Sequence, residues 1–157
     1  MMDGIQAARE PQTNVAGIES EVHVVAVGPA SRDIRTQATR LVARALLRRH
    51  GLAPCKTCEE VSDCGRAEFI SNGSRCYIDH DYVEYSTQAC SSTREVVAAV
   101  AAGDMLIQQA IAEADLALPS SARLMAVRNT CDRSRRGHSY GAHVNVSMKR
   151  AAFDRLM

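Results

Sequence analysis

The chain has 157 residues, 46% of them hydrophobic and 24% charged, which suits one globular domain with its own hydrophobic core. Its formal net charge is +1, so no overall basic field favours nucleic acid or an anionic membrane as a partner. No uninterrupted apolar run approaches the ~20 residues of a membrane span, and the opening MMDGIQAAREPQTN lacks the apolar segment of a secretory signal. We therefore expect a cytoplasmic protein with a flexible tail at residues 1–14.

The first predicted elements are a strand and a helix. Alternation of apolar residues predicts a half-buried strand from Val15 to Val27. After a turn at Gly28-Pro29, Ser31 is a suitable N-cap for a helix that ends at Gly51. One face of this helix is apolar, and it consists of Ile34, Ala38, Leu41, Val42, Ala45 and Leu46.

A loop at residues 52–66 contains three of the six cysteines, Cys55, Cys58 and Cys64. Thiolates at this spacing can share a tetrahedral zinc ion, for which Cys76 or a histidine would be the fourth ligand. No second CxxC motif is present, and a chain without a secretory signal is expected to keep its thiols reduced. A loop with free thiols is therefore favoured, and a zinc site is the alternative.

The second half of the chain adds short strands and one long helix. Strands at Ala67–Ile70 and Arg75–Asp79 flank an Asn-Gly pair, which is typical of a hairpin turn. Ser92 and Glu95 form a capping box at the start of a helix that ends before Pro119, and Gly103 should weaken its middle by ~1 kcal/mol. Two further strands are expected near Ala122–Val127 and Ser139–Met148. This order predicts an α+β fold with a mainly antiparallel sheet and amphipathic helices on one face.

Three of the predicted strands have one polar and one apolar face, because successive side chains alternate between the faces of a strand. The polar faces hold Glu19, Glu21 and His23; Arg75, Tyr77 and Asp79; and Gly141, His143, Asn145 and Ser147. The opposite faces hold Ile18, Val22 and Val24; Cys76 and Ile78; and Ala142, Val144, Val146 and Met148.

The polar faces have two possible explanations. An open antiparallel sheet keeps one face in water, and such faces are polar for that reason alone. Carboxylates crowded on one face, however, repel each other unless a cation lies between them. Hard oxygen ligands of this kind suit Mg²⁺, which commonly bridges to phosphate. A Mg²⁺–phosphate site and a solvated sheet face are therefore both open from the pattern.

Three segments resemble the Pup ligase and Pup deamidase (depupylase) family of the carboxylate–amine ligase superfamily, which includes glutamine synthetase. They are GIESE from Gly17, NGSRCYIDHDYVEYST from Asn72 and NTCDRSRRGHSYGAHVN from Asn129, in the order found in that family. The resemblance implies a partial glutamine-synthetase-like cradle, ATP and Mg²⁺ as cofactors, and Pup and pupylated proteins as partners.

The resemblance also implies roles for individual residues. Asp79 matches the catalytic aspartate, which activates or acts as the nucleophile at the carboxyl-terminal glutamine or glutamate of Pup. The Mg²⁺ ions would lie near Glu19, Glu21, Tyr77 and Glu84, and the nucleotide near His143, Asn145 and Tyr140. The alternative for Glu84 is a solvated acid in a loop, for Tyr77 a packing role, and for His143 an ordinary hydrogen-bonded histidine. His23 matches no family position and is expected to be a surface histidine.

Spacing favours the depupylase branch, because four residues separate Asp79 from Glu84, as in the depupylase pattern, whereas the ligase pattern has one more. Val144 stands where the family has glutamate, and Val83 where it has proline. The resemblance covers the N-terminal part of the family only, so we expect residues 15–157 to be a partial catalytic domain with little activity alone, possibly completed by a second chain. The alternatives are a non-catalytic binding module of the same fold and a fragment of a Pup ligase or another carboxylate–amine ligase.

Overall fold

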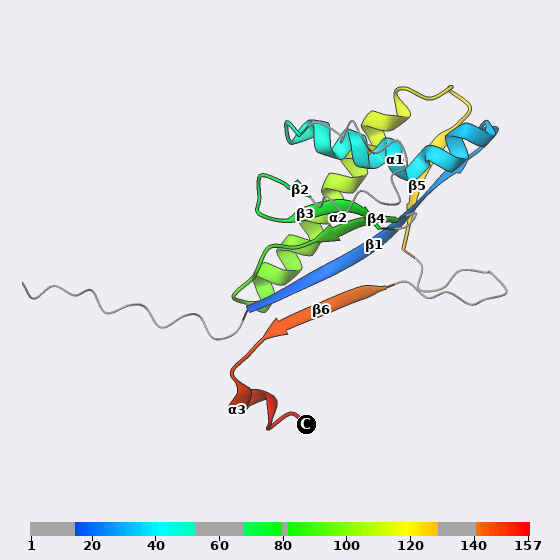
Figure 1. Ribbon diagram of the computed structural model, residues 1–157. Helices are drawn as coiled ribbons and strands as arrows, with labels where there is room; N and C mark the ends of the chain where they lie inside the picture. The colour runs from blue at the N-terminus through cyan, green and yellow to red at the C-terminus, as the bar shows by residue number, and fades with distance from the viewer. Residues whose placement is uncertain (1–14, 53–67, 80–81, 129–140) are drawn as a thin grey trace, which may run out of the picture.

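The computed structural model describes residues 15–52, 68–79, 82–128 and 141–157 (Figure 1). The described elements are β1 (Val15–Val27), α1 (Arg32–Arg49), β2 (Glu68–Phe69), β3 (Arg75–Asp79), β4 (Tyr82–Ser86), α2 (Thr93–Asp115), β5 (Arg123–Val127), β6 (Ala142–Ser147) and α3 (Arg150–Phe153). The predicted α+β class and antiparallel sheet are confirmed.

The sheet is organised around β1, whose 13 residues are long enough to pair with three other strands. One edge of β1 pairs with β4, which continues through β3 to β2. The other edge pairs with β6 along its first half and with β5 along its second half. All of these pairs are antiparallel, so residues far apart in the sequence lie opposite each other on β1.

Helices α1 and α2 pack against each other and against one face of the sheet (Figure 1). Both begin at the serine expected from the sequence, because the side chains of Ser31 and Ser92 accept hydrogen bonds from the N–H groups of Ile34 and Glu95. Glu95 completes the second cap by accepting from Ser91 rather than from Ser92. These caps satisfy backbone donors that the first turn leaves free.

The core lies between the helices and β1, β3 and β4. Its fully buried members include Val42 and Leu46 of α1 and Val83 of β4. The expectation that the helices also cover β6 is wrong, since Val144 and Val146 are 65% and 52% exposed on the side that was expected to be covered. In Figure 1, β6 forms the margin of the sheet away from the helices and leads into α3.

Two further expectations are corrected by tertiary packing. The segment after Asp79 was not expected to form a strand, yet Tyr82–Ser86 is β4 and pairs with both β1 and β3. Gly103 was expected only to weaken α2, but a Cβ at this position would lie 2.4 Å from the ring of Tyr85. The glycine therefore permits close approach between α2 and β4.

Helix α2 is long and apolar enough, by length and composition alone, to cross a membrane. This is weak evidence for a span, because core helices of soluble proteins meet the same criterion. Five residues of α2, Ala99, Gly103, Ile107, Ala110 and Ala114, are buried, as in a helix that packs in a protein core.

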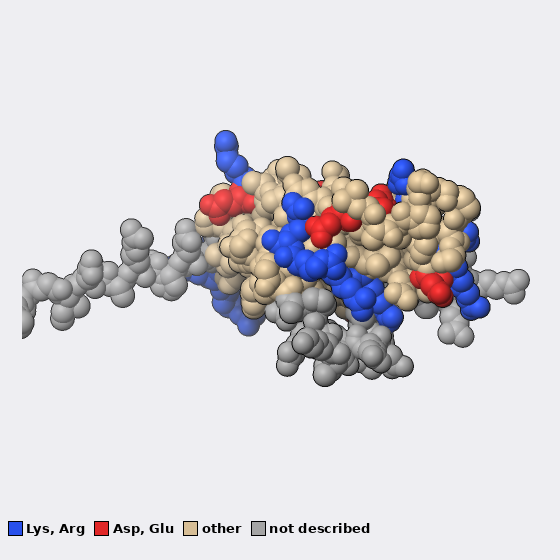
Figure 2. Space-filling model, turned by 90° about the horizontal axis from the view of Figure 1, so that it is seen from above, with Lys and Arg blue, Asp and Glu red and all other residues tan. Residues whose placement is uncertain are grey.

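The arginines are concentrated on α1 despite the near-neutral total charge. This helix contains six of them and one acidic residue, Asp33. Figure 2 shows basic side chains gathered in a band across the face seen there, beside a small acidic group. Arg48 and Arg49 lie 3.4 and 3.6 Å from the carboxylate of Glu113, which joins the last turn of α1 to α2. Because these pairs are partly exposed, they contribute little stability.

Candidate functional site

Three carboxylates converge on the face of the sheet that the helices leave open. Glu21 of β1, Asp79 of β3 and Glu84 of β4 each offer an oxygen, and these oxygens lie within 4.8 Å of one another. The strand register causes this convergence, because Glu21 lies opposite Glu84, and Asp79 lies opposite Tyr82, two residues before Glu84. Glu84 is therefore not the loop acid of the alternative interpretation.

Glu84 is the most buried of the three acids, with only 4% of its surface exposed. Burial raises the pKa of its carboxyl group, and the negative charges of Glu19, Asp79 and Glu21 raise it further. A hydrogen bond from Tyr77 acts in the opposite direction but does not cancel these effects. A cation among these oxygens would offset the repulsion, and carboxylate oxygens are the ligands that Mg²⁺ prefers. The donor set thus fits the implied metal.

Tyr77 lies opposite Glu84 across β3 and β4, and its hydroxyl donates a hydrogen bond to Glu84 Oε1. Burial, followed by this hydrogen bond, raises the pKa of Tyr77 to about 12. The phenol therefore stays protonated at neutral pH and holds the Glu84 carboxylate in place. The guanidinium carbon of Arg75 lies 5.6 Å from the centre of the Tyr77 ring, so a cation also borders the acids.

A second pair extends the polar face onto β6. Glu19 lies opposite His143, and His143 Nδ1 is 3.3 Å from Glu19 Oε2. Two residues further along β1, the N–H of Gly141 donates to Glu21 Oε2 at 3.2 Å. The first residues of the β6 segment thereby fix the carboxylates of both β1 acids.

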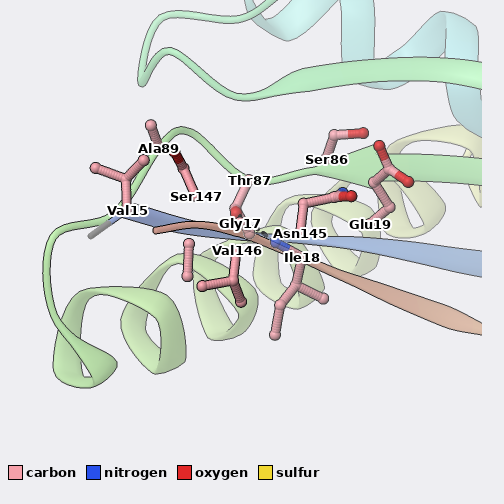
Figure 3. A pocket seen from close by; sticks show the side chains of 11 residues that line it. Val15, Gly17, Ile18, Glu19, Ser86, Thr87, Ala89, Asn145, Val146 and Ser147 are labelled. Atoms are coloured by element: carbon pink, nitrogen blue, oxygen red, sulfur yellow. Dashed lines mark hydrogen bonds between the residues drawn. The ribbon is translucent and has the colours of Figure 1, made fainter. Parts of the chain in front are cut away.

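An open groove of about 550 Å³ adjoins Glu19 at the β1–β4–β6 junction. Figure 3 shows the side chains of Glu19, Ser86 and Asn145 on one side of the sheet, whereas Ile18 and Val146 point to the other side. The groove thus begins where the acidic patch ends. We name the open face that carries Glu19, Glu21, Tyr77, Asp79, Glu84 and His143 the acidic face.

The structure brings together most of the residues selected from the sequence. The members of the acidic face converge, and Asn145 lies beside them in the groove. Tyr140 and the three loop cysteines lie outside the described residues. Cys76 is described as a buried free thiol in the core, and burial raises its pKa to about 12. His23 contacts the ring of Tyr82, with 5.0 Å between the ring centres.

Sequence reasoning gave no role to Ser86 and Thr87, which line the groove. Thr87 Oγ1 accepts a hydrogen bond from the N–H of Ile18 at 3.0 Å, so it also ties the end of β4 to β1. Ser86 shares a strand face with Glu84 at a spacing of two residues. That spacing would have revealed it, had residues 82–86 been recognised as a strand.

The same acids and the same three segments are the basis for comparison with known proteins. The sequence profile of the family described as Pup-ligase protein matches residues 7–157. The chain belongs to this family.

Individual relatives of this family carry two different names. The chain is 31% identical over 142 residues to a Pup–protein ligase of Micrococcus luteus, which covers 87% of the chain and 27% of that protein. It is 35% identical over 106 residues to a Pup deamidase/depupylase of Mycolicibacterium smegmatis, covering 67% and 20%, respectively. It is 30% identical over 157 residues to a depupylase of Acidothermus cellulolyticus, covering 94% and 30%.

A solved structure supports the fold as well. The chain is similar, with a TM-score of 0.62 and 25% identity, to a chain in the crystal structure of the complex between prokaryotic ubiquitin-like protein Pup and its ligase PafA. The match covers 90% of this chain and 28% of that one. This similarity agrees with the glutamine-synthetase-like arrangement expected from the sequence. The chain spans less than a third of the length of the family members described here.

Proposed function

We propose that the acidic face is the metal and nucleotide side of a depupylase-type site. The reaction would be the ATP- and Mg²⁺-dependent hydrolysis of the carboxyl-terminal amide of Pup, or of the isopeptide bond between Pup and a lysine of a pupylated protein. The observation that carries this proposal is the convergence of Asp79 with Glu21 and Glu84 within 4.8 Å. Membership of the Pup-ligase family supports the choice of Pup as the partner.

In this proposal, Glu19, Glu21 and Glu84 hold the metal, and the groove beside Glu19 receives the nucleotide together with His143 and Asn145. Bound Mg²⁺·ATP would supply positive charge among the acids and a phosphate group near the reacting carboxyl. Tyr77, which donates to Glu84, would orient that carboxylate toward the ion. The neighbouring Glu21 and Glu84 would then repel Asp79 less, because the cation offsets their charge.

Asp79 would act at the carboxyl-terminal carbonyl of Pup, either by accepting a proton from the attacking water or by attacking the carbonyl itself. Its place at the last residue of β3 brings the carboxylate to the end of the acidic face. A carboxylate fixed by a paired strand on each side loses little further entropy on reaction. This rigid placement supports Asp79, rather than Glu19, as the reacting group.

The branch within the family rests on a different observation. Four residues separate Asp79 from Glu84, as in the depupylase pattern, and this spacing supports hydrolysis over ligation. Val144 stands where the family has glutamate, and this departure favours the second candidate, a non-catalytic module that binds metal and nucleotide. The two candidates share the metal site and differ only in turnover.

Metal binding can be tested by thermal unfolding in chelator-treated buffer, with Mg²⁺ or Mn²⁺ added. An ion at 10–20 times its Kd stabilises the folded state by about 1–2 kcal/mol, which is several degrees in Tm for a chain of this size. Glu84→Gln and Asp79→Asn should each reduce this shift. Glu113→Gln is the matched control, because Glu113 pairs with the arginines of α1. A folded chain whose Tm ignores both ions would refute the metal site.

Turnover is tested separately with a Pup–protein conjugate, ATP and Mg²⁺. Release of Pup that is abolished by Asp79→Asn supports the depupylase, whereas new conjugates formed from free Pup would indicate a ligase. A metal-dependent Tm shift without either reaction would support the binding module. The metal assay and the activity assay therefore separate the two candidates.

A further inference from the structure

The edge of β6 that faces away from β1 carries backbone groups without a strand partner. Among the described residues, β6 pairs with β1 alone, and all six of its residues are exposed. In antiparallel pairs, successive residues direct their N–H and C=O groups alternately to the two sides of the strand. The Glu21 N–H donates to the Gly141 carbonyl at 3.3 Å, which assigns the odd-numbered residues to β1. Ala142, Val144 and Val146 therefore direct their backbone groups outward.

This edge lacks the features by which proteins usually protect exposed strands. Lysine, inward-pointing charges and proline commonly block edge-to-edge pairing. The six residues of β6, AHVNVS, include no Lys, Arg, Asp, Glu or Pro. Val144 and Val146 add exposed apolar surface on the side of the helices. An unprotected, partly apolar edge of this kind is expected to have a partner.

The same strand read in the opposite direction complements itself. We propose that β6 pairs antiparallel with β6 of a second copy of this chain, about a two-fold axis at Val144. In this register Val144 exchanges both backbone hydrogen bonds with the partner's Val144, and Ala142 does so with the partner's Val146. Small and branched apolar side chains thus meet on the helix side, and no like charges oppose each other.

The other free edge on this side of the sheet is less suitable. In β5 the outward-pointing N–H of Leu124 already donates to Asp115 Oδ1 at 2.7 Å. Arg123 and Arg128 stand at and just beyond its two ends, so pairing of two β5 strands would bring arginines together. The self-pairing edge is therefore β6.

Pairing of this kind would extend the acidic face across the two-fold axis. His143 would lie opposite the partner's Asn145, with the two Cα atoms about 4.5 Å apart, as in any non-hydrogen-bonded antiparallel pair. Because His143 Nδ1 contacts Glu19, the partner's Asn145 would join the row Glu19–His143. Each site would then contain an amide from the other copy.

The test is the molar mass in solution, measured by light scattering or sedimentation over about a hundredfold range of protein concentration. The wild-type chain should reach twice its 17.0 kDa monomer mass as the concentration rises. Val144→Pro removes an outward N–H and leaves the bonds to β1 intact, because proline is tolerated where the N–H faces solvent. This variant should remain monomeric.

Ala126→Pro is the matched control, since the same reasoning directs the Ala126 N–H to the outer edge of β5. This variant should dimerise like the wild type. If Val144→Pro fails to fold, hydrogen exchange of the wild type gives the answer, because the Val144 and Val146 amides should exchange more slowly at high concentration. A wild-type monomer at every concentration, a dimer that survives in folded Val144→Pro, or exchange independent of concentration would each overturn the proposal.

Discussion

The contact between Gly103 of α2 and Tyr85 of β4 leads to a prediction about stability. A Cβ at position 103 would lie 2.4 Å from both Cδ1 and Cε1 of the Tyr85 ring. The ring is only 2% exposed, and its hydroxyl donates to Ser74 Oγ at 2.8 Å and accepts from Asn72 Nδ2 at 3.1 Å. It is therefore held at both ends and cannot move aside without breaking these bonds.

The size of the effect follows from two opposing contributions. Alanine in place of glycine favours an exposed helix interior by ~1 kcal/mol. Overpacking of a filled core typically costs ~1–3 kcal/mol, and ring contacts closer than ~3.5 Å place this site toward the upper end of that range. We therefore expect Gly103→Ala to lower the free energy of unfolding by about 2 kcal/mol, which corresponds to a drop in Tm of about 4–8 °C.

Urea unfolding monitored by circular dichroism measures this change. Ala98→Gly, at an exposed position of the same helix, is the control that isolates helix propensity, and it should cost only ~1 kcal/mol. In a Tyr85→Leu background, Gly103→Ala should lose most of its penalty, because the two residues are coupled. A Gly103→Ala protein at least as stable as the wild type would show that the close approach of α2 and β4 does not limit this position.

Three more predictions concern the acidic face and the start of β5. A spectrophotometric titration should show one of the four tyrosines with a midpoint of about 12, and Tyr77→Phe should remove it; a set titrating together near 10 would contradict the Tyr77–Glu84 contact. Because the folded-state pKa of Glu84 lies above its ordinary 4.5, its contribution to stability is full below pH 4.5 and is lost as pH rises through the folded-state pKa. In metal-free buffer, unfolding experiments should show this loss, and Glu84→Gln should flatten it; equal slopes would refute the cause. Asp115→Ala should cost ~1 kcal/mol by removing the acceptor of the Leu124 N–H, while Asp115→Asn retains an acceptor and should cost less.

Local chemistry made part of the fold predictable from the sequence. Ser31 and Ser92 mark the starts of α1 and α2, because capping depends on a few adjacent residues. The β2–β3 hairpin was expected from Asn-Gly, and Gly73 has a φ of +81°, which glycine adopts without strain. Strand β3 has the predicted bounds, Arg75–Asp79.

The missed features depend on contacts that a local pattern does not contain. The segment Tyr82–Ser86 is short, and adjacent Tyr82 and Val83 are both buried, so alternation is hidden at its start. Its pairing with β1 is what makes it a strand and moves Glu84 from an expected loop to a buried position. The sequence likewise showed which side of β6 is apolar, but not that the helices do not cover Val144 and Val146.

The acidic face was predictable in composition and less so in arrangement. Alternation alone assigned Glu19 and Glu21 to one side of β1, and His143 to one side of β6. That Glu21 meets Asp79 and Glu84, while Glu19 meets His143, follows from the register of three separate strand pairs. Register is set by hydrophobic packing of the opposite face and by turns, which no single segment reveals.

The long strand β1 also dictates when the acidic face can form during folding. The Glu19–His143 contact closes a separation of 124 residues, and the Glu21–Gly141 contact one of 120. Contacts so distant along the chain are expensive in loop entropy and form late. During synthesis β1 emerges first and must wait for β6 to emerge, with one edge unpaired along residues 15–20. Until then the first half of β1 is a hazard for aggregation, and its two acids and histidine, which keep that segment charged in water, would restrain premature pairing.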